Sequence, residues 1–152
     1  MKLAEALIER AELQRKNGEL VKRISDNLLV QEGDQPAEDP KVLLAQYEKN
    51  RDRLLYLMRH INLTNQTIPF DEEGSLADAI IRRDNLKHKI ATYRSICSSG
   101  NVRIDRYSPK EVRYVRTLDT PALQAHVDSL SKQYRELDTR LQGINWTVDL
   151  VE

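Results

Sequence analysis

The sequence has little glycine, proline, aromatic residue or cysteine. Glycine and proline number five each among 152 residues, aromatic residues make up 5%, and Cys97 is alone. A single cysteine excludes an internal disulfide and agrees with a reducing compartment. Charged residues reach 32%, a balance typical of long exposed helices rather than of a sheet. The composition therefore predicts one all-α domain over residues 1–152.

An excess of charge and a long apolar run are also missing. Lys+Arg and Asp+Glu are each 24, so the chain has no basic footprint for nucleic acid. The longest apolar run, residues 54–58, is far shorter than the roughly 20 residues of a membrane span. Met1 and Lys2 lead directly into an amphipathic repeat and leave no room for a secretion signal. We expect a cytoplasmic protein without nucleic-acid or membrane partners.

The most prominent feature that is present is a repeat. Residues 3–10, LAEALIER, return as residues 76–83, LADAIIRR. Each copy precedes a segment of the form Ile-Asn-x-Thr, at 61–64 in the first half and at 144–147 in the second. A match between two Leu/Ala/Arg-rich helices can also arise by chance. We interpret the repeat as a duplicated helical hairpin.

Four segments carry apolar residues at the spacings of three and four that mark an amphipathic helix. They predict helices over about residues 3–28, 40–64 and 76–97, and from 120 to about 144. Asp39 is placed to cap the second helix ahead of Pro40. Because short connections between long helices make antiparallel neighbours, we expect two αα-hairpins, residues 1–68 and 75–152, in a bundle or coiled-coil-like fold.

Residues 102–117, between the third and fourth helices, have no equivalent in the first half. Their alternating pattern favours a β-ribbon, although Ser108-Pro109-Lys110-Glu111 could equally open a helical turn. A free two-stranded ribbon is marginal in water, so it should pack on a second subunit. The basic insert and the acidic loop 31–39 could meet across that interface. The interface candidates are Arg103, Arg106, Tyr107, Arg113 and Tyr114.

Polar residues should gather at the opposite end of the bundle, where the helices fold back. An arginine on a helix seam is costly unless it meets a carboxylate or an anion, so a small anionic ligand could lie between Arg10 and Arg83. Structural ion pairs are the stronger interpretation, since Arg83 falls opposite Glu136 and Asp138. Glu5 and Asp52 are within reach of Arg10. The candidate ligand-binding residues are Arg10, Arg83, Asp84, Asn62, Thr64 and Asn145.

Recognisable catalytic motifs are missing. The sequence has no glycine-rich phosphate loop, no nucleophile elbow and no cysteine–histidine pair at a useful spacing. Glu9 and Glu12 have the spacing of half a magnesium site, but a charged helix face explains them better. We therefore expect no metal, no cofactor and no catalytic residue, and nothing in the sequence supports an enzyme.

Several segments resemble the septicolysin-like family of small bacterial proteins. They are residues 1–7, 31–33, 36–40, 61–65, 83–84, 106–108, 135–138 and 145–146. The resemblance implies an all-helical protein without an established activity, and it brings no catalytic residues. The cytolysin label implies membrane attack, which this chain gives no physical reason to expect, because it lacks an export signal, a span and a strongly hydrophobic amphipathic surface.

Two functions are compatible with these observations. The preferred one is a non-enzymatic, self-associating helical protein, a homo-oligomer that acts through protein–protein contacts. The alternative is a small anionic ligand- or nucleotide-binding protein, or a hydrolase, that uses the Arg10/Arg83 end of the bundle.

Overall fold

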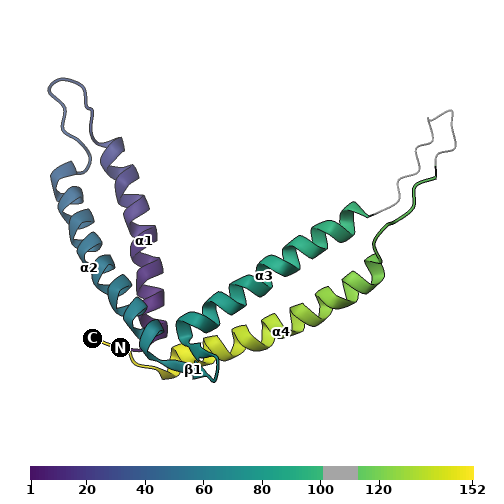
Figure 1. The fold of residues 1–152 in the computed structure, drawn as a ribbon. Helices are drawn as coiled ribbons and strands as arrows, with labels where there is room; N and C mark the ends of the chain where they lie inside the picture. The colour runs from purple at the N-terminus through teal and green to yellow at the C-terminus, as the bar shows by residue number, and fades with distance from the viewer. Residues whose placement is uncertain (101–112) are drawn as a thin grey trace. The chain divides into compact units, whose positions relative to one another are not determined.

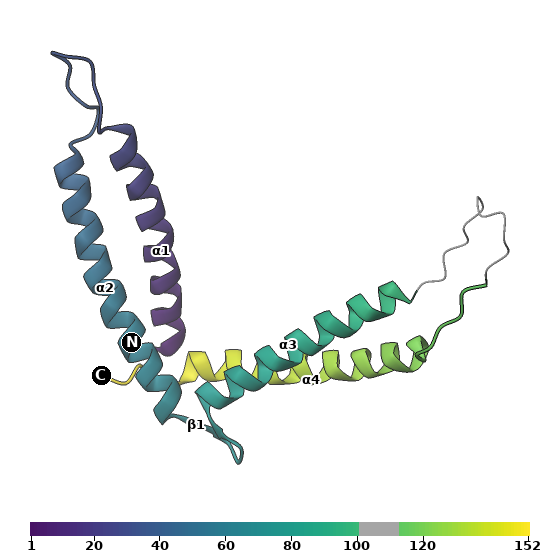
Figure 2. The ribbon, with the colours of Figure 1, turned by 45° about the horizontal axis from the view of Figure 1, so that its top comes forward.

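The computed structural model describes residues 1–100 and 113–152 and is all-α apart from one small sheet. Its elements are α1 (Leu3–Asp26), α2 (Pro40–Thr67), β1 (Pro69–Asp71), β2 (Gly74–Ser75), α3 (Leu76–Ser99) and α4 (Thr120–Thr147). α1 and α2 lie side by side and run in opposite directions, and so do α3 and α4 (Figures 1 and 2). The predicted fold class of four long helices in two antiparallel hairpins is confirmed.

The two hairpins have matching dimensions, in agreement with a duplication. α1 and α3 each contain 24 residues, and α2 and α4 each contain 28. The repeated motif begins both α1 and α3, at the buried residues Leu3 and Leu76. The amide of Leu3 donates to the carbonyl of Val148 at 2.9 Å, and the amide of Leu76 donates to that of Ile68 at 3.0 Å. Both carbonyls belong to the residue directly after a long helix.

The chain between α2 and α3 forms the small sheet. β1 and β2 pair antiparallel, with Pro69 opposite Ser75, and Gly74 turns the chain at a φ of 142°, where a residue without a Cβ is favoured. The sequence pattern predicts only a turn in this stretch. The β-ribbon expected at 102–117 lies outside the described residues up to residue 112, and residues 113–117 carry no strand.

The chain divides into two compact units. The first comprises residues 1–77 and 142–152, and the second comprises residues 78–141. The first unit buries alanines and leucines from α1, leucines and Ile61 from α2, and also Phe70, Leu76 and Leu150. In the second unit Ile90, Val127 and Leu130 form the buried cluster, and Leu86, Tyr93 and Tyr134 pack around it. Ala79 and Leu141 are the other buried residues described in this unit, so among the described residues its core holds few large side chains and is thin.

Local chemistry fixes where the helices of the first unit begin. The carboxylate of Asp39 accepts from the amide of Lys41 at 2.9 Å and Pro40 occupies the first turn, which confirms the predicted N-cap. At the start of α1 the amide of Lys2 donates to the Glu5 carboxylate at 2.7 Å. These bonds satisfy amides that the helix itself leaves unpaired.

The residues after α4 return to the start of the chain and tie it to α2. The amide of Leu150 donates to the carbonyl of Met1 at 2.9 Å, and the Lys2 ammonium lies 2.9 Å from the Asp149 carboxylate. The amide of Val151 donates to the hydroxyl of Thr64 at 2.9 Å. That hydroxyl in turn donates to the carbonyl of His60 at 2.7 Å, and Thr64 is fully buried. The Thr64 hydroxyl therefore fastens the C-terminal tail to α2.

Replacing the Thr64 hydroxyl by a methyl group tests how much this contact with the tail contributes to stability. Thr64→Val keeps the volume and leaves the partly buried amide of Val151 without its acceptor, which should lower the free energy of unfolding in urea by about 1–3 kcal/mol. The matched control is Thr67→Val, because the exposed Thr67 hydroxyl bonds only carbonyls of its own helix. Its effect should stay within about 0.5 kcal/mol. Equal losses in both variants would contradict this role of the Thr64 hydroxyl.

Candidate functional site

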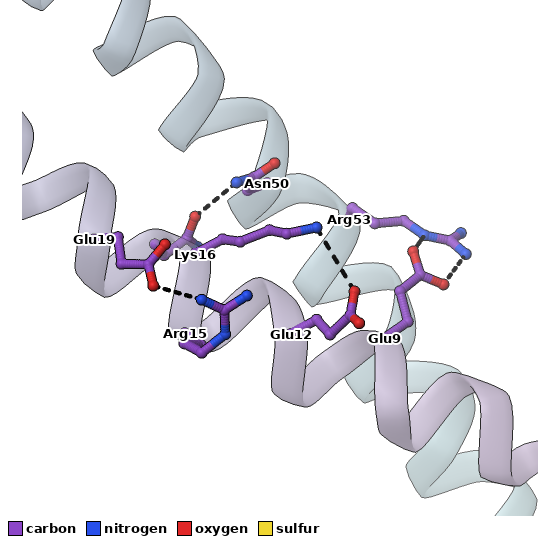
Figure 3. A network of polar contacts seen from close by, with 8 residues as sticks. Glu9, Glu12, Arg15, Lys16, Glu19, Asn50 and Arg53 are labelled. Atoms are coloured by element: carbon purple, nitrogen blue, oxygen red, sulfur yellow. Dashed lines mark hydrogen bonds and ion pairs between the residues drawn. The ribbon is translucent and has the colours of Figure 1, made fainter.

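The polar residues of the α1–α2 hairpin form pairs both between the two helices and along α1 (Figure 3). The Glu9 carboxylate accepts two bonds from the Arg53 guanidinium, at 2.7 and 2.8 Å. These hydrogen bonds hold the pKa of Glu9 below its ordinary value of 4.5, although partial burial acts in the opposite direction. One turn further along α1, Glu12 lies 3.6 Å from Lys16. Both carboxylates of the hypothetical half magnesium site thus already face cations.

The chain of contacts continues from Arg53 to the C-terminal tail. The guanidinium lies 5.0 Å from the centroid of the Tyr56 ring. The Tyr56 hydroxyl donates to the Glu152 carboxylate at 2.9 Å, and this bond raises the pKa of Tyr56. His60 lies beside Tyr56 with ring centroids 4.2 Å apart, and its Nδ1 donates to the carbonyl of Val151 at 2.9 Å. Every one of these polar groups has a structural partner.

Asn17 and Asn50, which lie on the facing sides of α1 and α2, meet in the seam. The Asn50 amide donates to the Asn17 carbonyl oxygen at 3.0 Å. Asn17 is buried, and its own amide nitrogen has no hydrogen-bond partner within residues 1–100 and 113–152. A partly buried polar pair between two helices favours one helix register over its alternatives.

The predicted ligand-binding residues of the first unit do not share one environment. Arg10 is half-buried on α1 and forms no ion pair or hydrogen bond with any described residue. Thr64 is occupied by the tail, Asn62 is exposed on α2, and Asn145 is half-buried near the end of α4. Only Thr64 among these residues has a role that the contacts define.

Arg83 of the second unit is held by carboxylates. Its guanidinium lies 2.9 Å from Asp84, the next residue, and 3.2 Å from Asp138 on α4. Burial lowers the pKa of Arg83, but the bonds to Asp84 and then Asp138 outweigh it, so the net shift is upward. The structural ion pair predicted between Arg83 and Asp138 is thereby confirmed.

The tip of the α1–α2 hairpin carries a feature that the sequence pattern did not predict. Leu28, Leu29 and Val30, which we call the tip segment, are 63%, 91% and 48% exposed. The loop below them is closed, because the Asn27 side chain accepts from the amide of Glu38 at 3.0 Å and donates to the carbonyl of Arg23 at 2.9 Å. Arg23 also forms a bidentate ion pair with Glu38. The tip segment is therefore an exposed apolar run on a fixed loop.

Of the predicted interface residues, Arg113 and Tyr114 are described and both are exposed. Arg103, Arg106 and Tyr107 lie outside the described residues. Across residues 1–100 and 113–152 no three His, Cys, Asp or Glu side chains are grouped so as to hold a metal ion. In the same part of the chain, no helix combines the length and apolar character of a membrane span.

The chain matches a family of unknown function, DUF6847, over residues 10–150, and it therefore belongs to that family. A search of the curated proteins found no match. Among solved structures, the crystal structure of a functionally unknown conserved protein from Corynebacterium diphtheriae is similar, with 42% sequence identity and a TM-score of 0.92. The match covers 99% of each chain. Neither description states an activity.

The Glu9–Arg53 pair predicts a pH-dependent contribution to stability. Because the pKa of Glu9 is lower in the folded chain, the contribution is present above pH 4.5 and is lost as the pH falls through the folded pKa. Glu9→Gln should lower the free energy of unfolding at pH 7 by up to about 1 kcal/mol, and the difference from wild type should vanish in acid. Urea unfolding across pH measures both. Glu12→Gln is the control, and an equal pH-dependent loss there would argue against the pair.

Proposed function

We propose that the protein is a non-enzymatic, self-associating helical protein of the cytoplasm that acts through protein–protein contacts. The observation that carries this proposal is the tip segment. Three consecutive exposed apolar residues are unfavourable on the surface of a protein that stays monomeric, and they are tolerated where a partner covers them. Because Asn27 and the Arg23–Glu38 pair close the loop, the tip segment stays presented outward.

The thin core of the second unit supports the same proposal. Its two helices bury few large side chains, and the tyrosines Tyr93 and Tyr134 lie at the edge of the cluster, only partly covered. Covering apolar surface is worth about 25 cal/mol per Å², so a hairpin of two helices gains stability from any further chain that packs on it.

The hydrogen bonds of the polar groups favour a protein that acts through protein–protein contacts over an enzyme. Four titratable or hydroxyl side chains of the first unit come nearest to forming a cluster, and each of them is bound by a helix or by the C-terminal tail. They are Glu9, Tyr56, His60 and Thr64. Arg83 is engaged by two carboxylates. A catalytic acid, base or nucleophile has to reach a substrate, and these side chains are held by structural bonds.

Size-exclusion chromatography with light scattering tests self-association. The wild-type protein at micromolar concentration should have a mass above that of one chain. Leu29→Gln removes the most exposed apolar side chain of the tip segment and should raise the dissociation constant on the order of tenfold, which corresponds to about 1.4 kcal/mol.

The matched control is Ile81→Gln, which changes an isolated apolar residue of α3 that is 66% exposed. The control should associate like wild type, because a single apolar residue on a polar face needs no partner. A wild-type protein that remains a monomer throughout the micromolar range would contradict the proposal.

Arg10 favours a second candidate function, the binding of a small anion. Its guanidinium is half-buried and has no carboxylate partner among the described residues, whereas Arg83 already has two. A guanidinium in such surroundings suits the bidentate capture of a phosphate or carboxylate. Binding at Arg10 would not require Arg83, which changes the two-arginine site expected from the sequence. From the sequence resemblance we also propose that the chain is related to the septicolysin-like family.

Thermal unfolding with inorganic phosphate or a nucleotide tests this candidate. A ligand at 100 times its dissociation constant stabilises by about 2.7 kcal/mol, which raises Tm by roughly 5–10 °C in a chain of this size. The rise should disappear in Arg10→Gln and persist in Arg51→Gln, an exposed arginine of α2. The absence of any shift up to millimolar ligand in wild type would rule the candidate out.

A further inference from the structure

We propose that the tip segment of one copy binds residues 113–118 of a second copy, a stretch that we call the basic segment. This inference rests on the proposed self-association and names the two surfaces that meet. Both surfaces lie in loops that connect the helices of a hairpin, the first between α1 and α2 and the second before α4 (Figure 1).

The tip segment is followed by unpaired acids. Glu32 and Asp34 are exposed, and their carboxylates form no ion pair with any described residue. The other two acids of the loop are occupied: Glu38 pairs with Arg23, and Asp39 caps α2. The exposed part of this loop therefore contains three apolar side chains and two negative charges.

The basic segment is the complement of that surface. Its apolar side chains Tyr114, Val115 and Leu118 are 65%, 76% and 54% exposed. Arg113 is exposed without a partner among the described residues. Arg116 anchors the segment, because its Nε donates to the carbonyl of Gly100 at 2.7 Å. At the other end, Asp119 accepts from the amide of Ala122 at 3.0 Å and caps α4. The segment is thus anchored in its middle at Arg116, and Asp119 fixes the chain directly after it.

Charge decides which surfaces pair. Two tips brought together would oppose the acids Glu32 and Asp34 with their copies, and two basic segments would oppose arginine with arginine. Like charges across an interface cost free energy and select against such pairings. A tip against a basic segment covers apolar surface on both sides and sets carboxylates against guanidinium groups. The residues therefore favour the unlike pairing between copies.

The first experiment is a charge exchange measured by sedimentation velocity at low salt. Asp34→Arg and Arg113→Glu should each weaken self-association at least about tenfold, because each places like charges across the contact. An equimolar mixture of the two variants should associate again, since the altered tip then meets an altered basic segment of opposite charge. Glu48→Arg, which reverses an exposed acid of α2, is the control and should associate like wild type.

The second experiment locates the contact with cysteines in a Cys97→Ser background. Leu29→Cys in one sample and Val115→Cys in another should, on mixing and mild oxidation, form the mixed disulfide in preference to either homodimer. A predominant Leu29→Cys homodimer would overturn the pairing in favour of tip against tip. A disulfide within a single chain that carries both substitutions, in place of one between chains, would overturn it as well.

Different results would contradict self-association and the contact between the tip segment and the basic segment. If the wild type associates but the mixed variants do not recover and the mixed disulfide does not form, self-association stands and the contact is elsewhere. If the wild type is a monomer at every concentration, the proposed function fails together with this inference.

Discussion

The pairing of two antiparallel helices is the interaction on which each hairpin depends. A helix buries one apolar stripe against its partner, which makes the core between the two helices narrow. Within such a core a one-turn slip costs little, which gives the Asn17–Asn50 bond its importance for register. The Glu9–Arg53 pair acts at the edge of the same stripe, where its charges remain partly hydrated.

The parts of the structure that repeat locally could be predicted from the sequence. The four helices follow from periodic apolar residues, and the cap at Asp39 from a residue type that accepts backbone hydrogen bonds. The Arg83–Asp138 pair followed from antiparallel register, because facing residues then have a nearly constant sum of numbers. The strands β1 and β2 did not, since three and two residues are too few to show alternation.

The candidate site was harder to predict because its contacts are single and distant in sequence. The hydroxyl of Thr64 and the amide of Val151 are 87 residues apart, and no periodic pattern in the sequence predicts such a bond. The sequence pattern extends the first helix into the tip segment, whereas the last turn of α1 ends at Asp26. A signal for the tip segment was present, since Leu28, Leu29 and Val30 are consecutive and break the spacing of the helix seam.

The return of the tail beside the start of α1 makes the order of synthesis matter for folding. The side chain of Lys2 bonds to a carbonyl 145 positions later, so the unit that is translated first is also the last to be finished. Until the residues after α4 have been synthesised, the amide of Leu3 and the hydroxyl of Thr64 lack their partners Val148 and Val151 and are hydrated instead. Contacts between residues so far apart in the sequence slow folding, because the chain must close a long loop before it gains them.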